Sequence, residues 1–233
     1  MSTYAVILAG GVGVRLGAGI PKQFVDLGGR PIIDYSLEAF CGSDLIDEVI
    51  VVMAPEHRET VAGLVAEKGY GKVSALVDGG ETRFDSTGAA LAHLAGHEGR
   101  ILVHDAARPF LPQETIAGCV KALEDFDAVA TVVDSADTIV VLDDAHQHIE
   151  STLDRNRLRR LQTPQAFGLD TLAKAFDLAR HDTAFLATDD FTLVRRYLPD
   201  ASTTFIDGSA RTFKITEPED LIIAEAFLAE GRI

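Results

Sequence analysis

Two cations, Arg15 and Lys22, lie in a glycine-rich segment near the N-terminus that could bind a polyanion. The segment follows the apolar, β-branched run Tyr4–Leu8, which is typical of a buried strand. Its glycines are Gly10, Gly11, Gly13, Gly17 and Gly19. Glycines have no Cβ, so successive backbone N–H groups can turn toward one anion. The segment therefore predicts a cradle for a triphosphate; the alternative is a tight strand-to-helix turn with surface cations.

This segment differs from the two common phosphate-binding loops. It does not end in Gly-Lys-Ser/Thr, as the loop of P-loop NTPases does. Leu16 also stands where the Gly-x-Gly-x-x-Gly pattern of dinucleotide-binding folds needs a small third residue. The sequence therefore disfavours a dinucleotide-dependent dehydrogenase.

The elements that must position these residues alternate along the chain. Apolar runs predict strands at Ala5–Leu8, Glu48–Met53, Val73–Val77, Arg100–His104 and Ala128–Val133. Helical patterns cover Pro31–Cys41, Glu56–Lys68, Ser86–Ala95 and Gln113–Leu123. Strands that alternate with helices predict a mainly parallel sheet, with ligands bound at its C-terminal edge. The polar motifs Ala9-Gly10-Gly11, Gly79-Gly80 and His104-Asp105 all follow strands directly, as that geometry requires.

The pattern changes at residues 135–157. This segment reads as a strand, a polar turn at Asp143–His148 and a second strand, which predicts a projecting β-arm. An arm of this kind usually packs against something, and a second subunit is the simplest candidate. His146 and His148 resemble a metal-binding pair, but they occupy a turn tip without a third ligand, so a turn is favoured.

The C-terminal third is predicted to be helical at Thr171–Arg180, at Asp189–Tyr197 and from Glu217 onward. Thr216-x-x-Glu219, with Pro218 between them, predicts a capping box. Asp189 and Asp190 could bind a metal, but acids favoured in the first turn of a helix by its dipole are the preferred interpretation.

Composition limits the class of protein. The 233 residues, 47% of them hydrophobic, can bury a substantial core and suit one α/β domain. A net charge of −15 disfavours nucleic acid and anionic membranes as partners, and a phosphate site must concentrate the few cations. Cys41 and Cys119 are predicted to be buried thiols. No apolar stretch is long enough for a membrane span and no secretory leader is evident, so we expect a cytoplasmic protein.

The ordered motifs resemble one enzyme family over Ala5–Phe227, nearly the whole chain. They read AGGVGVRLGAGIPKQF, GGETRFDS, VHDAARPF, DT, DRN, QTPQAF, TDD and FKITEPEDL. They are similar to the family of 2-C-methyl-D-erythritol 4-phosphate cytidylyltransferase and D-ribitol-5-phosphate cytidylyltransferase. The resemblance implies a single domain over residues 1–233 with a Rossmann-like nucleotidyltransferase sheet, helices on both faces and the β-arm. It also implies a homodimer with arm exchange, a role in isoprenoid biosynthesis, and CTP and a polyol phosphate as substrates.

The resemblance implies roles for individual residues. The catalytic cations would be Arg15, Lys22 and Lys214, which stabilise charge as the acceptor phosphate attacks the α-phosphorus of CTP. The nucleotide would be bound by Ala9, Gly10, Gly11, Gly80, Arg83 and Ser86. The acceptor would be bound by Asp105, Arg108, Thr138, Arg155 and Thr163. Mg²⁺ would be held mostly by the CTP phosphates, with help from Asp105. Glu81 departs from the Asp that many members carry.

Plainer structural interpretations stand beside these roles. Arg83 could pair with Asp85 at a helix start, and Asp105 could form a structural ion pair with Arg108. Lys214 could be a surface lysine at the end of a strand. Each interpretation predicts a contact that a structure can test.

Two features bear on the acceptor and disagree. His-Asp-Ala-Ala-Arg-Pro is typical of the methylerythritol enzymes, whereas the opening Ile-Leu-Ala-Gly-Gly and Val140 lean toward the ribitol branch, which makes CDP-ribitol for cell-surface polymers. Methylerythritol phosphate is slightly favoured. The wider alternatives are a nucleotidyltransferase that uses UTP or GTP with a sugar phosphate, and a non-catalytic nucleotide-sensing module.

Overall fold

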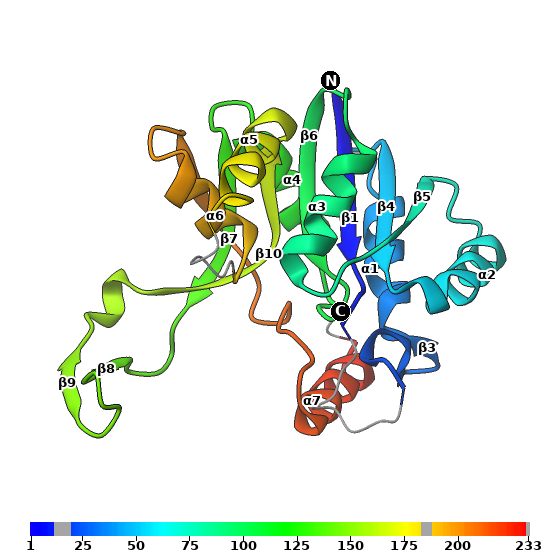
Figure 1. Ribbon diagram of the computed structural model, residues 1–233. Coiled ribbons are helices and arrows are strands. Elements are labelled where there is room, and N and C mark those ends of the chain that lie inside the picture. Colours follow the sequence, from blue (N-terminus) through cyan, green and yellow to red (C-terminus); the bar gives the residue numbers. More distant parts are fainter. Residues whose placement is uncertain (12–19, 183–187, 232–233) are drawn as a thin grey trace.

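The computed structural model describes residues 1–11, 20–182 and 188–231. Within them, a seven-stranded sheet has the order β11-β7-β10-β6-β1-β4-β5 (Figure 1). Neighbouring strands are parallel except at β10, which is antiparallel to β6 and β7. The strands are β1 (Ser2–Leu8), β4 (Glu48–Met53), β5 (Val73–Asp78), β6 (Gly99–Asp105), β7 (Ala128–Asp134), β10 (Arg159–Gly168) and β11 (Thr203–Asp207). The predicted α/β class and mainly parallel sheet are confirmed.

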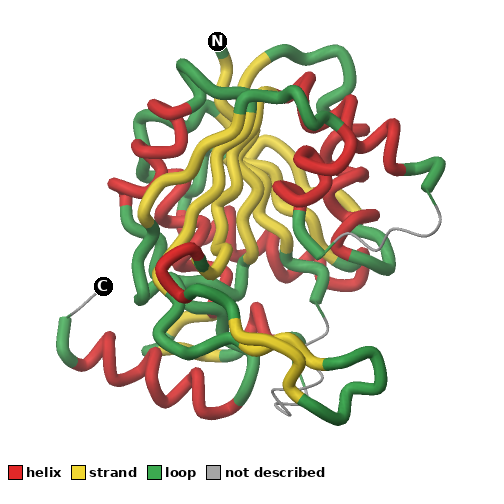
Figure 2. The backbone as a smooth tube through the Cα atoms, turned by 90° about the vertical axis from the view of Figure 1, so that its left-hand side faces the viewer, coloured by secondary structure: helices red, strands yellow, loops and turns green. Residues whose placement is uncertain are grey.

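Helices cover both faces of this sheet (Figures 1 and 2). One face packs against α1 (Ile32–Cys41), α2 (Arg58–Lys68) and α4 (Gln113–Ala122). The other packs against α3 (Arg83–His93), α5 (Leu169–Ala179) and α6 (Asp190–Tyr197). Side chains alternate along β1, so Ala5 and Ile7 join the first core while Tyr4 and Val6 join the second. Each fully buried Ile or Leu contributes about 1.5–3 kcal/mol, which fixes the register of the central strands.

A smaller layer lies beyond the C-terminal edge of the sheet. It contains the last helix α7 (Pro218–Ala229) and the short strands β2 (Asp26–Leu27) and β3 (Arg30–Pro31). Buried Leu27, Ile32 and Ile215 hold it together in a third apolar cluster. The described chain also contains three short 3₁₀ helices: η2 (Lys22–Phe24), η3 (Pro55–His57) and η4 (Arg155–Arg157). No helix among the described residues is long and apolar enough to cross a membrane.

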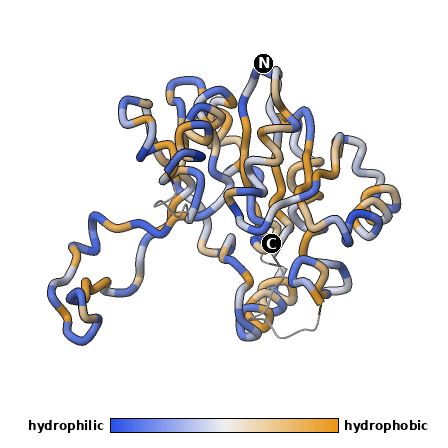
Figure 3. The backbone as a smooth tube through the Cα atoms, viewed as in Figure 1, coloured by the Kyte–Doolittle hydropathy of each residue, from blue (hydrophilic) through white to orange (hydrophobic). Residues whose placement is uncertain are grey.

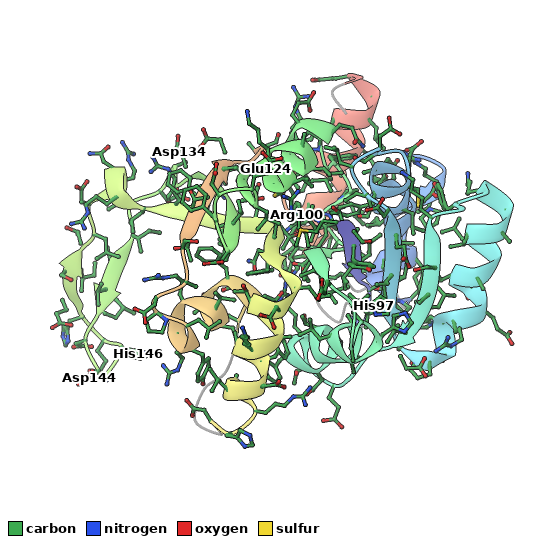
Figure 4. The ribbon with its side chains drawn as sticks, turned by 90° about the horizontal axis from the view of Figure 1, so that it is seen from above. His97, Arg100, Glu124, Asp134, Asp144 and His146 are labelled. Carbon is green, nitrogen blue, oxygen red and sulfur yellow. The ribbon has the colours of Figure 1, made fainter. Side chains whose placement is uncertain are left out.

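The segment 135–157 projects from the body as predicted (Figure 1). Its two strands, β8 (Val140–Leu142) and β9 (Ile149–Thr152), form an antiparallel hairpin. Figure 4 places Asp144 and His146 at the far tip of this arm, whereas His97 and Arg100 lie on the body. Asp143 closes the turn by accepting from the backbone N–H of Gln147 at 2.8 Å. The turn interpretation of this stretch is therefore confirmed.

Apolar residues recur on the arm (Figure 3) although it has no buried face. Ile149 is 65% exposed. The others are Ile139, Val140, Val141, Leu142 and Leu153, all at least 36% exposed. A cluster of exposed apolar residues on one hairpin is typical of a segment that contacts another protein chain.

The capping box of the last helix is shifted by one residue from its predicted place. Glu217 is the N-cap, and its partner is Asp220 rather than Glu219. The Asp220 carboxylate accepts from the backbone N–H of Thr216 at 2.7 Å and of Glu217 at 2.9 Å. An acidic side chain three residues into the helix satisfies both donors, so the threonine hydroxyl is not needed as the cap.

Candidate active site

A cavity opens at the C-terminal ends of β1 and β6, where the predicted motifs follow their strands. It is lined by Leu8, Ala9, Gly10, Gly11, Lys22, Gln23, Gly80, Glu81, Thr82, Arg83, Ser86, Asp105, Ala106, Ala107 and Lys214. The sequence-predicted residues among them are Ala9, Gly10, Gly11, Lys22, Gly80, Arg83, Ser86, Asp105 and Lys214. Segments separated by some two hundred residues therefore meet at the sheet edge where ligands bind in open α/β folds.

The backbone after β1 is held from both sides. The N–H of Ala9 donates to the carbonyl of Val52 at 2.7 Å, and the buried Gln23 amide donates to the carbonyl of Ala9 at 2.7 Å. Gln23 belongs to η2, the short helix that begins at Lys22. Fixing Ala9 in this way leaves Gly10 and Gly11 beside the cavity. Arg15 lies outside the described residues.

The two glycine motifs meet at Ser86. A Cβ on Gly10 would lie 3.6 Å from the Ser86 hydroxyl oxygen, and one on Gly79 would lie 3.0 Å from it. A Cβ on Gly80 would clash with the Asp85 side chain at 2.2 Å. Gly80 therefore admits no larger residue, because the first turn of α3 folds directly over it. Ser86 is buried in that turn, within reach of a ligand that enters between the glycines.

The start of α3 explains why Arg83 does not pair with Asp85. Thr82 and Asp85 form a reciprocal capping box in which the Thr82 hydroxyl accepts from the Asp85 N–H and the Asp85 carboxylate accepts from the Thr82 N–H. The Arg83 guanidinium instead turns toward β6. It binds Asp105 at 3.3 Å through Nε and Asp190 at 2.7 Å through Nη1. The plainer Arg83–Asp85 interpretation is wrong, since the cap occupies that carboxylate.

Asp105 is the centre of the charged network. Its carboxylate also binds Lys214 Nζ at 2.8 Å and lies 3.8 Å from Arg108 Nε. Burial alone would raise the pKa of Asp105, but the charges of Arg83, Lys214 and Arg108 outweigh burial and hold that pKa well below its ordinary value. Asp105 is therefore ionised at neutral pH. The predicted ion pair between Asp105 and Arg108 exists. It is the longest of the three contacts that the Asp105 carboxylate makes with cations.

The donor set decides whether a divalent cation fits. Among the described residues, no three His, Cys, Asp or Glu side chains are grouped to hold a metal ion. Carboxylates of Asp105 and Glu81 line the cavity. Mg²⁺ is commonly bound by one or two carboxylates together with substrate phosphates. The residues present therefore fit a cation carried in with a polyphosphate, and not a metal held by protein ligands alone.

The predicted acceptor residues fall into two groups. Arg108 and Thr163 lie behind the cavity: Arg108 Nη1 donates to the carbonyl of Thr212 at 2.8 Å, and Thr163 is 3% exposed. Thr138 and Arg155 are exposed on the arm, outside the cavity of their own chain, and Arg155 donates to the carbonyl of Ala136 at 3.2 Å. Asp105 is the one of the five predicted acceptor residues that lines the cavity of the same chain.

Sequence reasoning missed several residues of the site. Asp190 lies in the first turn of α6 as predicted, but it is also buried and holds Arg83, whereas its neighbour Asp189 is the N-cap of that helix. Gln165 fixes that helix start, because its side-chain carbonyl accepts from the N–H groups of Asp190 and Phe191 at 3.1 and 2.9 Å. The Asp-Asp pair before an amphipathic helix indicates an N-cap, but the local sequence does not show that the second acid has a buried partner. The identity of the partner depends on tertiary contacts.

The fold and this cavity define an α/β enzyme of the nucleotidyltransferase class: a mainly parallel sheet, a glycine-lined cavity at its C-terminal edge, and lysines gathered around it. The sequence is more specific. Residues 3–230 match the family described as "IspD: 2-C-methyl-D-erythritol 4-phosphate cytidylyltransferase", and the chain belongs to this family of CTP-dependent cytidylyltransferases.

Individual relatives agree with this assignment. The 2-C-methyl-D-erythritol 4-phosphate cytidylyltransferase of Bifidobacterium longum is 41% identical in an alignment of 232 residues that covers 97% of this chain and 80% of that protein. The structure of 4-diphosphocytidyl-2C-methyl-D-erythritol synthase from Anaerococcus prevotii is similar, with a TM-score of 0.86, 28% identity and 98% of both chains covered. A bifunctional ribulose 5-phosphate reductase/CDP-ribitol pyrophosphorylase of Haemophilus influenzae is 35% identical over 94% of this chain but 47% of that longer protein.

Proposed function

We propose that this protein transfers the cytidylyl group of CTP to 2-C-methyl-D-erythritol 4-phosphate and releases pyrophosphate. The observation that carries the proposal is the cavity in which Lys22, Lys214 and Asp105 meet the glycine motif after β1. In the reaction, an oxygen of the acceptor phosphate attacks the α-phosphorus of CTP and the bond to the pyrophosphate oxygen breaks. The acceptor oxygen is already ionised at neutral pH, so the protein needs no general base.

The lysines supply charge where the reaction needs it. Lys22 lies beside the backbone of Gly11, where it faces a triphosphate, and Lys214 faces the α-phosphate or the acceptor phosphate. Negative charge grows on the α-phosphate and the leaving group in the transition state, and positioned cations stabilise it more than they stabilise bound CTP. Arg15 belongs to the same proposed set.

Base recognition is assigned to the region around α3. Ala9, Gly10 and Gly80 offer close backbone, and Ser86 offers a hydroxyl, for the amino and carbonyl edge of cytosine. The Arg83 guanidinium is engaged by two carboxylates, which limits its reach into the cavity. We therefore assign Arg83 the task of holding Asp105 in place beside the base site.

The acceptor phosphate is assigned to Arg108 and to the arm of a second copy. Thr138 and Arg155 lie on the arm, and its exposed apolar residues would be covered in a homodimer. Each active site would then be composite, with one chain supplying the cavity and the other supplying Arg155, whose planar fork suits a phosphomonoester. The single-domain organisation, with the arm as a dimerisation element, is part of this proposal.

A divalent cation, with Mg²⁺ as the first candidate, completes the proposed site. Asp105 is the side chain that would contact it, and the triphosphate of CTP would supply the other ligands. When bound, the cation neutralises charge on the phosphate oxygens during transfer. The protein's own share is to keep the Asp105 carboxylate ionised and fixed, through Arg83 and Lys214.

Ribitol 5-phosphate is the second candidate acceptor, supported by the Haemophilus influenzae relative. The test is pyrophosphate release from CTP, measured separately with methylerythritol 4-phosphate and with ribitol 5-phosphate, and with UTP and GTP in place of CTP. We expect the highest kcat/KM with CTP and methylerythritol 4-phosphate. Faster turnover of ribitol 5-phosphate would move the protein to the second activity. CTP binding without release of pyrophosphate from any mixture would support the sensing alternative instead.

A further inference from the structure

His104 is completely buried on β6, directly before Asp105, and the proposed reaction gives it no role. Its Nδ1 lies 3.0 Å from the Thr163 hydroxyl, and its Nε2 lies 3.1 Å from the carbonyl oxygen of Arg108. The same Thr163 hydroxyl accepts from the backbone N–H of Asp105 at 3.1 Å. The imidazole therefore links β10 to both ends of the turn that carries Asp105 and Arg108.

The hydrogen-bond partners determine where the protons lie. A carbonyl oxygen can only accept, so Nε2 of His104 must carry a proton and donate it to Arg108. Nδ1 of the neutral ring then accepts from the Thr163 hydroxyl, whose oxygen is left to accept from Asp105 N–H. In this series of three hydrogen bonds, each donor meets an acceptor. One neutral tautomer therefore satisfies all of the buried groups at once.

These hydrogen bonds fix the turn formed by residues 105–108. The Arg108 N–H donates to the Asp105 carbonyl at 3.0 Å, so the turn closes on itself. Thr163 hydrogen-bonds to the first residue of this turn, Asp105, and His104 hydrogen-bonds to the last residue, Arg108. The rings of Phe40 and His104 pack edge to face, with their centroids 5.4 Å apart. The Asp105 carboxylate and the Arg108 guanidinium both project from this turn toward the charged network.

We propose that His104 and Thr163 form a positioning pair that sets the distance between the Asp105 carboxylate and the cations of the active site. The inference rests on the proposed function and deepens it, because it gives Thr163 a task behind the turn instead of a direct contact with the acceptor. The pair acts through Asp105 and Arg108 and touches neither substrate. Its loss displaces the turn, and small displacements of charged groups reduce turnover strongly.

Two substitutions of His104 separate its two contacts. His104→Asn keeps a polar group near the place of Nδ1 and loses the donor to Arg108, whereas His104→Gln keeps a donor near the place of Nε2 and loses the acceptor for Thr163. We expect kcat to fall roughly 10-fold to 100-fold in each variant, with the KM for CTP changed less than threefold. His93→Asn, at an exposed position on α3, is the matched control and should behave as wild type.

Substitutions of Thr163 test the proposal independently. Thr163→Val removes the hydroxyl and should lower kcat as the His104 variants do, whereas Thr163→Ser restores the hydroxyl and should return kcat to within about threefold of wild type. The double variant Thr163→Val, His104→Gln should lose little more kcat than either single variant. Both changes remove the same contact, the hydrogen bond between the Thr163 hydroxyl and Nδ1 of His104. A direct contact with the acceptor predicts the opposite: a raised KM for the polyol phosphate and full additivity. That outcome would overturn the proposal.

A spectroscopic measurement keeps the proposal testable without turnover. ¹⁵N NMR of the histidine-labelled wild-type protein at pH 7 should show His104 as a neutral ring protonated only at Nε2, and Thr163→Val should perturb its Nδ1 signal. A ring protonated at Nδ1, or unaffected by Thr163→Val, would contradict the inference. No turnover by the wild type would refute the proposed function and leave this measurement to decide the geometry. Normal turnover by both His104 variants would overturn the inference alone.

Discussion

Single side chains concentrate positive charge in a chain whose net charge is −15. Lys22, Lys214, Arg83 and Arg108 gather at one sheet edge, and the buried carboxylate of Asp105 contacts the last three of them. Such a cluster attracts a polyanion because the cations outnumber the carboxylates there. The acidic remainder of the surface would repel the same ligand. Binding of CTP therefore depends on a few side chains whose removal can be tested singly.

Lys22→Ala should lower kcat/KM for CTP by roughly 100-fold to 1,000-fold, since losing one positioned charge costs about 3–4 kcal/mol of transition-state stabilisation. The fold should be preserved, because Lys22 lies at the cavity and outside the three apolar cores. Steady-state pyrophosphate release and circular dichroism measure the two effects. Lys174→Ala, which removes an exposed lysine of α5, is the matched control. A fully active Lys22→Ala enzyme would exclude this lysine from the mechanism.

Asp190→Asn should destabilise the protein and loosen Arg83. The carboxylate is 2% exposed and holds Arg83 at 2.7 Å, so the neutral amide leaves a buried guanidinium with one charged partner in place of two. We expect a loss of about 1–3 kcal/mol in the free energy of unfolding, measured by urea denaturation. Asp170→Asn removes the exposed partner of Lys174 and should cost less than about 1 kcal/mol. Equal losses in the two variants would argue against a structural role for Asp190.

Stability should also depend on pH through His104. Burial lowers the pKa of His104 from 6.5 to about 4, whereas the unfolded chain keeps the ordinary value. As the pH falls through 6.5 the unfolded state gains a proton that the folded state does not, so this residue destabilises the fold below pH 6.5, increasingly until about pH 4. We expect its contribution at pH 5 to be about 2 kcal/mol less favourable than at pH 8. Chemical denaturation at both pH values should show a loss of stability that is about 2 kcal/mol larger for the wild type than for His104→Asn.

At the level of secondary structure, the sequence predicts well where apolar periodicity is strong. Strands β4, β5, β6 and β7 are found within one residue of their predicted bounds, and β1 begins three residues earlier than predicted. Strand β10 was not predicted because it begins with Arg159 and Arg160 and carries the buried glutamines Gln162 and Gln165. Those polar residues are tolerated because their side chains hydrogen-bond to Ser209 and to the start of α6. Such partners lie far away in the sequence, so no local pattern reveals them.

The same limit applies to the site. The glycine motifs and the residues that follow β6 are placed by local pattern, since parallel strands end at a common edge. The partners of Arg83 are not, because Asp105 and Asp190 reach it from other elements. The resemblance to a family supplied Lys214, which lies in a segment without regular secondary structure and contacts Asp105 across the cavity. Sequence alone thus predicts the cavity better than its charge network.

The arm carries a prediction of its own. Arg155→Ala should raise the KM for the polyol phosphate at least tenfold and leave the KM for CTP nearly unchanged, because a guanidinium that forks a phosphomonoester contributes roughly 1.5–3 kcal/mol. Pyrophosphate release at varied acceptor concentration measures the effect. Arg180→Ala, at the end of α5 and remote from the arm, is the control. An unchanged affinity for the acceptor would remove Arg155 from the acceptor site.

The whole molecule is proposed to work as a pair of chains that exchange arms. At acceptor concentrations below the wild-type KM, two impaired variants should then complement each other, because a mixed dimer of Lys22→Ala and Arg155→Ala contains one site with an intact Lys22 and an intact partner arm. Random exchange of subunits should restore about a quarter of wild-type activity. Sedimentation should show a dimer before and after mixing. Mixtures that stay at the low activity of the separate variants while the subunits demonstrably exchange would count against composite sites.

The most direct test of the account is a crystal structure of the protein with CTP and Mg²⁺. We expect the triphosphate to lie between the backbone of Gly10 and Gly11 and the ammonium group of Lys22, with the cytosine beside Ser86. A nucleotide bound elsewhere, with its phosphates remote from Lys22 and from Asp105, would contradict it.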